Sequence, residues 1–491
     1  MISFEDLPRG LPREISTKDG APRAIWTPAE NLLQSPRWQF QTGAPLIGQD
    51  RNGKWICLDD DRHLFTLAGS RAGKGISMIL PNLDHYTGSI CCLDVKGENS
   101  GLTAQRRAEL GQEVFVFDPF HAADVPDEYR ANFNPLEDLD PTDPLFVDLC
   151  DSIAESLVVA ENGKDNDHWN ASGRMTLRGF IAWVASSSSG PRDLVEVYRL
   201  LHLPEAPDNY EGPNDPSAYF DHLLDAMIDT PERAWGVPAA MAGALLSMGH
   251  EERGSVLSTV RQNIVFVSSP LMGKMLSGGG RQCDLKAWKY GGMSIFIAIP
   301  AALLHRHSRF MRLLVNKLLY AIEAGEPVAR DKPKGLLILD EMHTLGRMPV
   351  LETAAALLAG AGVRIHAVSQ DLNQLEKNFG TAWQTFLGNA GVFQSFGLND
   401  MKSLKYVSDR LGTSSVMKIS QSEISYDQSV KGFKGQSNSI ESTPLLTPDE
   451  VAYHFSRQSG AQCVIYPGAS PIWMRRLDYW SDDFAKYRRA P

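Results

Sequence analysis

The sequence predicts an α/β fold in which a doubly wound, mostly parallel sheet carries an all-helical insertion. Short apolar runs alternate with helical stretches along the chain, and these runs do not alternate strictly between apolar and polar residues. Such runs are typical of strands that are buried on both faces of a parallel sheet. Strands and helices in alternation favour the doubly wound arrangement, with helices covering the faces of the sheet.

The elements follow one another in a regular order. A helix is expected at residues 74–84, directly after the first strand, and two more at 308–323 and 349–360, where apolar positions recur at three- and four-residue spacing. Strands are expected at residues 64–68, 89–93, 114–117, 293–299, 335–339, 363–368, 392–397 and 462–466.

The middle of the chain, residues 145–285, has helical periodicity and no clear strand, so the all-helical insertion is expected there. Its joints fall near Pro135–Pro144 and at the Gly-rich stretch 277–281. This segment contains 19 Asp and Glu against 10 Lys and Arg, and therefore carries −9 of the chain's net charge of −11. The acidity of the protein is thus concentrated in one segment.

Composition narrows the class of protein. A net charge of −11 argues against a protein that coats nucleic acid by charge alone. The six cysteines form no C-x-x-C pair, which favours reduced, buried thiols in a cytosolic protein over a zinc site or a disulfide framework. The N-terminus lacks the apolar core of a secretory signal, and the longest apolar runs fall short of the roughly 18 residues of a membrane span. We therefore expect no transmembrane segment.

Two further features lie near the end of the chain. Residues 413–443 are rich in Ser, Gln and Lys, which predicts a mobile loop or a long exposed hairpin. Ordered structure is expected to restart at "TPLLTPDEV", with Thr447 as the N-cap of a helix and Pro448 at its first position.

The stretch "LAGSRAGKGIS" at residues 67–77 places a Gly-rich turn between a strand and a helix. Backbone N–H groups of such a turn and of the helix N-terminus can hold phosphate, with Lys74 as a point charge. The stretch departs from G-x-x-x-x-G-K-[ST] at Ala68 and at Gly75, and an ordinary strand-to-helix turn is the alternative. The expected phosphate cradle consists of Gly69, Ser70, Arg71, Ala72, Gly73, Lys74, Gly75 and Ile76.

The stretch "KGLLILDE" at residues 334–341 is a Walker B pattern, in which four apolar residues precede two acids. An Asp at the end of a buried strand can hold Mg²⁺ through its water shell, which is the role expected of Asp340. Glu341 is placed to orient and deprotonate an attacking water molecule. A strand that ends in two solvated acids is the alternative, but the pattern together with the phosphate loop predicts a nucleotide site.

A third element completes the predicted chemistry. The strand "HAVSQD" ends in Ser369 and Gln370, and the Gln370 amide is a candidate sensor of the γ-phosphate or of the water. A hydrogen bond from that amide to a loop is the alternative. Transition-state charge also needs a cation, and Arg364 and Arg347 are candidates for an arginine finger supplied by a neighbouring subunit. Such a finger requires assembly into a ring.

Taken together, these stretches resemble the TraG-type coupling proteins of type IV secretion and conjugation. The similarity runs from about residue 37 to the end of the chain and includes "CCLDVKGE", "VFVFDPF", "LLILDEMHTLGRMPVLE", "VSQDLNQLEKNFG" and "PLLTPDEV". Ala68 and Gly75 match the family's form of the loop. The resemblance implies a RecA-like, usually hexameric ATPase with an all-helical insertion, in which Lys74 binds phosphate, Asp340 serves Mg²⁺ and Glu341 is the catalytic acid.

The resemblance predicts a protein that binds ATP and Mg²⁺ and passes DNA to a type IV secretion channel. The expected cargo is single-stranded DNA with a relaxase, or effector proteins. Most family members begin with membrane-spanning helices, whereas this chain begins with a polar segment. We therefore expect a cytoplasmic protein that a separate membrane subunit recruits to the inner membrane, or one that serves a soluble, divergent system. The expected division is a polar segment 1–36, a nucleotide-binding domain in two parts, 37–144 and 286–491, and an all-α domain 145–285.

Two other functions stay open at the level of sequence. One is a DNA-pumping translocase that is not tied to secretion, although an acidic insertion is poorly suited to phosphate contacts. The other is a nucleotide-gated receptor for protein substrates with little hydrolysis, because Gly75 offers no hydroxyl to Mg²⁺. Ser77 or a water molecule is expected to take that place. The 413–443 loop and the basic stretches "MRRL" and "KYRRAP" are candidates for contact with DNA.

Overall fold

The computed structural model describes residues 24–159, 167–202, 205, 210–329, 332–421 and 436–489. The chain forms two compact units, of which the first contains the described residues up to 86, residues 366–377 and those from 386 onward. The second unit contains residues 87–365 and 378–385. Each unit is built around parallel strands, which confirms the predicted α/β class.

In the first unit, β4 (His63–Ala68) lies between two parallel neighbours, β10 (Ala390–Phe396) and the part of β9 (Val363–Ser369) from His366 onward. All three strands are fully buried, as the apolar runs predicted. Beyond β10 the pairing becomes antiparallel through β13, β14, β2 and β3, which makes the sheet mixed. These outer strands are β13 (Ala461–Ile465), β14 (Ile472–Arg475), β2 (Leu46–Gln49) and β3 (Trp55–Cys57), with β1 (Thr27–Pro28) also paired to β14.

Two helices of the first unit start at residues whose side chains cap the helix N-terminus. In α15 (Met401–Leu411), the N-cap Asp400 accepts a hydrogen bond from the Ser403 N–H at 2.9 Å. In α17 (Pro448–His454), Thr447 and Glu450 form a capping box, which confirms the predicted N-cap. The remaining helices are α1 (Ala29–Leu32), α2 (Leu80–His85), α18 (Asp482–Arg489) and, shared between the units, α13 (Leu372–Phe379) and α14 (Trp383–Gly388).

In the second unit, the strands lie in the order β8, β5, β7, β6, and every neighbouring pair is parallel. They are β5 (Ile90–Asp94), β6 (Glu113–Phe117), β7 (Met293–Ala298) and β8 (Gly335–Leu339). Crossover helices connect them, as parallel strands require. These are α3 (Glu98–Glu109) and α11 (Leu304–Ala324), and α12 (Pro349–Leu357) follows β8.

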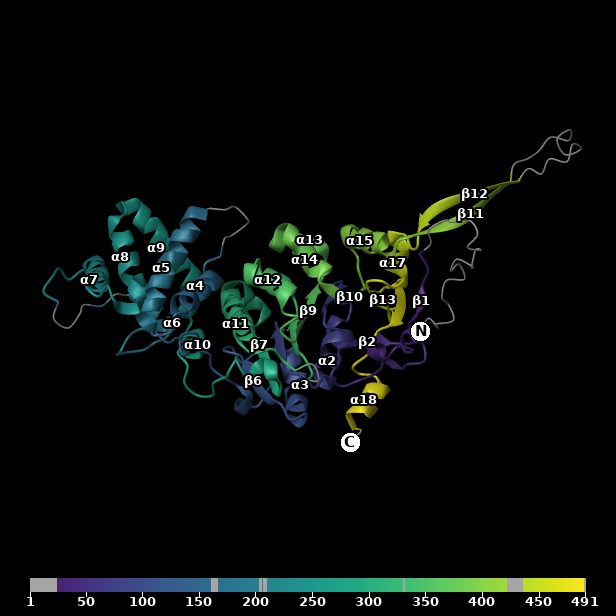
Figure 1. Ribbon diagram of the computed structural model, residues 1–491, viewed down its shortest axis with the longest axis horizontal. Helices are drawn as coiled ribbons and strands as arrows, with labels where there is room; N and C mark the ends of the chain where they lie inside the picture. Colours follow the sequence, from purple (N-terminus) through teal and green to yellow (C-terminus); the bar gives the residue numbers. More distant parts are fainter. Residues whose placement is uncertain are drawn as a thin grey trace, which may run out of the picture. The chain divides into compact units, whose positions relative to one another are not determined.

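The described residues between β6 and β7 contain helices and no strand. Figure 1 shows α4, α5, α8 and α9 side by side, and α5 contacts the other three. The helices are α4 (Phe146–Leu157), α5 (Asp167–Ala185), α6 (Leu194–His202), α7 (Pro216–Ile228), α8 (Val237–Ser247), α9 (His250–Ile264) and α10 (Pro270–Leu276). The acidic segment is therefore helical where it is described, and its domain boundaries stay a prediction.

The predicted loop or hairpin at 413–443 contains an antiparallel pair, β11 (Thr413–Gln421) and β12 (Gln436–Pro444). Figure 1 shows this pair extending away from α15 and α17 as a two-stranded arm. Residues 422–435 between the strands lie outside the described residues. In the part of the chain that the structure describes, no helix combines the length and the apolar character needed to cross a bilayer.

Candidate functional site

The predicted phosphate loop is a tight turn in the first unit, between the end of β4 and the following helix. The Gly69 N–H donates to the Phe396 carbonyl at 3.3 Å, so the loop starts against the end of β10. The Ala72 N–H then donates back to the Gly69 carbonyl at 3.1 Å. Arg71, a non-glycine residue, has a left-handed φ of 56°. Such strain is stored where surrounding structure dictates the backbone, and functional loops are frequent examples.

Close packing explains the small residues of this loop. A Cβ at Gly69 would lie 2.0 Å from the Gly397 carbonyl oxygen, so no side chain fits there. A Cβ at Gly397, whose φ is +62°, would lie 2.4 Å from the Cβ of Ala72. At Gly75, by contrast, nothing lies within 4 Å of an added Cβ. Crowding therefore requires glycine at 69 and 397 but not at 75.

The helix after the loop starts with a widened turn at Gly75–Ile79, in which the Leu80 N–H donates to the Gly75 carbonyl. The Ser77 N–H donates to the Gly73 carbonyl at 2.9 Å, and the Ser77 side-chain oxygen lies 3.8 Å from the Cβ position of Gly73. Ser77 is buried and Lys74 is half-buried, whereas Ser70, Arg71 and Ile76 are exposed. The Ser77 hydroxyl thus lies beside the loop, and its expected role toward Mg²⁺ stays a prediction.

The two acids of the Walker B pattern follow β8 in the second unit. Asp340 and Glu341 are half-buried, unlike two solvated acids at a strand end. Glu341 has a left-handed φ of 56°, and its carbonyl accepts the Thr344 N–H at 2.8 Å. The His343 Nδ1 lies 3.4 Å from a Glu341 carboxylate oxygen. Glu341 thus has a strained backbone and an imidazole beside its carboxylate.

A buried arginine fixes the turn that follows Glu341. Arg312 on α11 donates through Nη1 to the carbonyls of Leu345 and Arg347, the latter at 2.9 Å. Its Nε donates to the Ser156 carbonyl of α4 at 3.1 Å. Burial lowers the pKa of Arg312 to about 10, which leaves it protonated near neutral pH. One guanidinium thus joins the Walker B turn to a helix of the acidic segment.

A third carboxylate, which sequence reasoning did not assign to the site, lies at the end of β5. The register pairs Cys92 with Ile338, which brings Asp94 and Asp340 to the same end of neighbouring strands. Burial raises the pKa of the Cys92 thiol well above its ordinary value, and the charges of both aspartates raise it further. An acid that directly follows a buried apolar run, as in "CCLD", was the signal available in the sequence.

Asp94 organises the loop that follows it. Its carboxylate accepts hydrogen bonds from the Ser100 N–H at 2.7 Å, the Ser100 hydroxyl at 2.6 Å and the Asn99 N–H at 3.2 Å. Burial nevertheless raises the pKa of Asp94, because desolvation outweighs these hydrogen bonds. Gly97 has a φ of +73°, and a Cβ there would lie 2.7 Å from the backbone of Ala122. The loop after β5 therefore packs tightly on the loop after β6.

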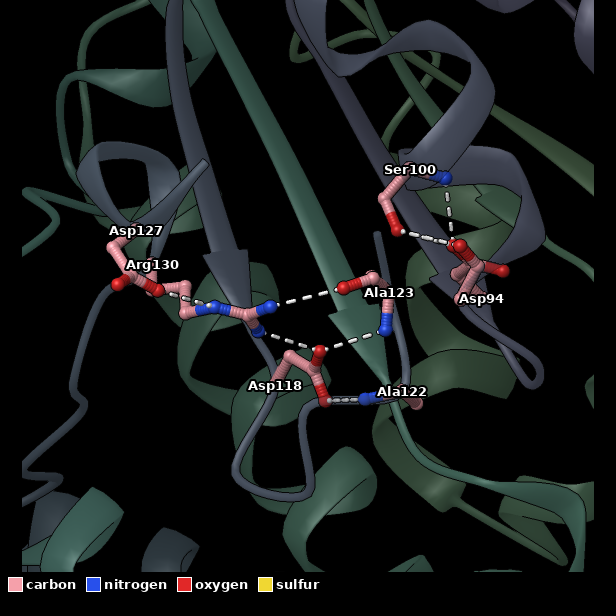
Figure 2. A network of polar contacts seen from close by, with 8 residues as sticks. Asp94, Ser100, Asp118, Ala122, Ala123, Asp127 and Arg130 are labelled. Carbon is pink, nitrogen blue, oxygen red and sulfur yellow. Dashed lines mark hydrogen bonds and ion pairs between the residues drawn. The ribbon is translucent and has the colours of Figure 1, made fainter. Parts of the chain in front are cut away.

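The loop after β6 is organised in the same way, as Figure 2 shows. Asp118 accepts hydrogen bonds from the N–H groups of Ala122 and Ala123, both at 2.9 Å. Arg130 bridges back through its Nη1 to Asp118 at 2.7 Å and through its Nη2 to the Ala123 carbonyl at 2.9 Å. Both loops lie at the carboxyl ends of parallel strands, the edge at which α/β sheets bind ligands.

The other predicted residues differ in exposure. Arg364 on β9 is 1% exposed, whereas the Arg347 side chain is 66% exposed and pairs with Glu352 at 3.3 Å. Of the two finger candidates, Arg347 is the one presented at the surface. Gln370 follows β9 and is half-buried. Lys74 and Gln370 belong to the first unit, and Asp340, Glu341 and both arginines belong to the second.

Comparison with known proteins identifies relatives. A family model described as "Type IV secretory system Conjugative DNA transfer" matches residues 17–491. The conjugal transfer protein TraG of Escherichia coli is 26% identical over 480 residues, which cover 90% of this chain and 71% of TraG. Protein VirD4 of Agrobacterium fabrum (strain C58) is 24% identical over 447 residues, which cover 89% of this chain and 62% of VirD4.

Solved structures share the fold. The bacterial conjugative coupling protein TrwBdeltaN70 in an unbound form has a TM-score of 0.63 at 15% identity, with 94% of this chain and 96% of that chain covered. TrwB in complex with ADP and Mg²⁺ has a TM-score of 0.62 at 14% identity, with coverage of 94% and 96%. Because the family model spans nearly the whole chain, this protein belongs to the type IV secretion family of conjugative DNA-transfer proteins, and the resemblance to TraG-type coupling proteins is confirmed.

Proposed function

We propose that this protein is an ATP-hydrolysing coupling protein, which recruits DNA or a relaxase–DNA complex and passes it to a type IV secretion channel. The observation that carries the proposal is the co-occurrence, in a member of this family, of the close-packed loop at Gly69–Gly75 with the strained, half-buried Glu341. TrwB, which shares the fold, has been solved with ADP and Mg²⁺ and with an ATP analogue.

The proposed roles follow from the local chemistry of each residue. The loop of residues 69–76 holds the phosphates through backbone N–H groups other than those of Gly69 and Ala72, which donate to carbonyls, and Lys74 neutralises the phosphate charge. Asp340 would hold Mg²⁺ through water, and Ser77 or water would take the place of the hydroxyl that Gly75 lacks. The bound cation supplies electrostatic stabilisation of the phosphoryl group during transfer.

Water activation is assigned to Glu341, whose carboxylate lies beside His343 and whose following turn is held by Arg312. Gln370 senses the γ-phosphate or the attacking water. In the proposed homo-hexamer, an arginine from the neighbouring subunit stabilises the transition state, and the exposure of Arg347 favours it over Arg364. A partner subunit recruits the cytoplasmic protein to the inner membrane face.

ATPase assays with and without single-stranded DNA test the proposal. Lys74→Ala and Glu341→Gln are expected to lose nearly all turnover, and Lys405→Ala, on the exposed face of α15, is the matched control that keeps it. Glu341→Gln should still bind nucleotide, because Glu341 is assigned to the chemical step alone. Equal turnover in the wild type and Lys74→Ala refutes the motor function.

A specific observation keeps the nucleotide-gated receptor as a second candidate. Gly75 is not required by packing, yet it removes the hydroxyl that normally binds Mg²⁺. If wild-type turnover does not exceed that of Glu341→Gln while nucleotide still binds, the receptor function replaces the motor. Cross-linking of the whole protein to channel subunits and relaxase distinguishes a third function, a DNA pump without a secretion role. Such a pump should cross-link to neither partner.

A further inference from the structure

A segment distant in sequence lies against the phosphate loop within the first unit. We call residues 476–479, which follow strand β14, the strap. Arg476 is only 8% exposed, and its Nη1 donates to the Ala72 carbonyl at 2.7 Å. Its Nη2 donates to the Arg457 carbonyl at 2.6 Å, and the guanidinium lies 4.7 Å from the centre of the Phe396 ring. This arginine of the "MRRL" stretch is therefore built into the protein.

The position of Arg476 places positive charge beside the loop. Its Nη1 lies 3.9 Å from the Cβ position of Gly73, the residue before Lys74. Burial, and then the charge of Arg457, lower the pKa of Arg476 to about 10, so that it stays protonated near neutral pH. A buried cation next to backbone N–H groups strengthens the attraction of the loop for an anion.

The strap also completes the hydrogen bonding of the helix that follows the loop. In the widened turn, the Gly75 carbonyl pairs with the Leu80 N–H five residues ahead, and the residue at the same spacing from Ile76 is Pro81. Proline has no N–H, so the Ile76 carbonyl needs another donor. The Tyr479 N–H supplies it, at 3.2 Å from the Ile76 oxygen.

We propose that the strap is a positioning element of the nucleotide site, in which Arg476 and the Tyr479 N–H hold the phosphate loop from both sides of Gly73–Gly75. This inference rests on the proposed function, because it names a further residue for the same site. Arg476 acts through the loop carbonyl and is a positioning residue. Its loss is expected to weaken nucleotide binding while the chemical step, which Glu341 performs, changes less.

The test uses the full chain and the variants Arg476→Met, Arg476→Lys and Arg475→Met. Arg475 is the matched control, because it neighbours Arg476 in sequence and its Nη1 donates to the Arg51 carbonyl. The readouts are the Kd of a fluorescent MgATP analogue and the KM and kcat for ATP. Arg476→Met should raise Kd and KM at least tenfold and change kcat less than threefold, with partial rescue in Arg476→Lys and no change in Arg475→Met. An unchanged Kd in a folded Arg476→Met overturns the proposal.

Hydrogen exchange tests the strap independently of ATP hydrolysis, and therefore independently of the proposed function. It also keeps the proposal testable if Arg476→Met fails to fold, because it uses the wild type and Arg476→Lys. In the ligand-free wild type and Arg476→Lys, exchange of the 69–78 amides is compared, and faster exchange in the variant supports the strap without any need for hydrolysis. Equal exchange overturns it. In the wild type, MgATP analogue should protect the amides of residues 474–480, and an unprotected segment in a protein that binds nucleotide also overturns it. Wild-type binding without turnover, by contrast, contradicts only the motor.

Discussion

Substitution of Gly397 by alanine tests how tightly the phosphate loop is packed. Gly397 follows β10 with a φ of +62°, and its Cβ would lie 2.4 Å from the Cβ of Ala72. Carbon atoms in favourable contact are about 3.5–4.0 Å apart, so the loop must move by more than roughly 1 Å. The loop has little freedom to do so, because the Gly69 N–H is bonded to Phe396 beside it.

Two contributions to the loss of stability add in Gly397→Ala. Left-handed backbone costs a residue with a Cβ about 1–2 kcal/mol, and overpacking a close-packed site costs about 1–3 kcal/mol more. Gly460→Ala is the matched control, because Gly460 has a φ of +65° and nothing within 4 Å of its Cβ position. The control therefore bears the backbone cost alone, and Gly397→Ala should lose about 2–5 kcal/mol in total.

The assay is hydrogen exchange of the β4 and β10 amides, which measures the free energy of opening this part of the protein. Titration with a fluorescent MgATP analogue measures the effect on the loop. Gly397→Ala should lose more opening free energy than Gly460→Ala and bind nucleotide at least tenfold more weakly. Equal losses in the two variants, together with unchanged nucleotide affinity, would refute the reasoning that Gly397 shapes the loop.

Three further variants test other features of the structure. Gly75→Ser should fold normally, because its Cβ position is open, and should need less Mg²⁺ for nucleotide binding; a higher Mg²⁺ requirement would show that Ser77 already fills the place. Arg312→Lys should lower kcat about tenfold or more with a smaller change in nucleotide Kd, because its carbonyl contacts hold the turn after Glu341; unchanged kcat contradicts this. Burial lowers the pKa of His366 from 6.5 to about 4. Between pH 6.5 and 4, His366 is therefore protonated in the unfolded chain and neutral in the folded chain. Stability should therefore fall as the pH drops from 6.5 toward 4, by up to about 3 kcal/mol, and His366→Asn should flatten this slope in thermal melts recorded at each pH.

Elements with a local cause were predictable from sequence. Each expected apolar run became a strand, from β4 to β13, because a continuous apolar run of this length, bounded by turn residues, suits a strand buried on both faces and is short for a helix. The Thr447 cap was equally accessible, since a capping box needs only residues three apart. The phosphate loop and the Asp340–Glu341 pair were predictable because each motif consists of consecutive residues.

Contacts between distant segments could not be read in this way. Gly69 must be glycine because of the Gly397 carbonyl, and Gly397 because of Ala72, yet neither segment reveals the other. The antiparallel pairing of β13 with β10 was also absent from the prediction, since a run buried on both faces does not encode its direction. Asp94 was quoted as part of a motif, but its place beside Asp340 follows from strand register.

Arg476 shows the difference most clearly. As part of "MRRL" it was a candidate for contact with DNA, because a basic pair in sequence says nothing about which side chain points inward. Alternation along β14 and its continuation turns Arg476 toward Ala72, where burial is compensated by carbonyl acceptors. Local patterns therefore determined the elements and the chemistry of the loop, because each depends on neighbouring residues. Which side chains support that chemistry depends on packing between remote segments, and that was settled by the folded chain alone.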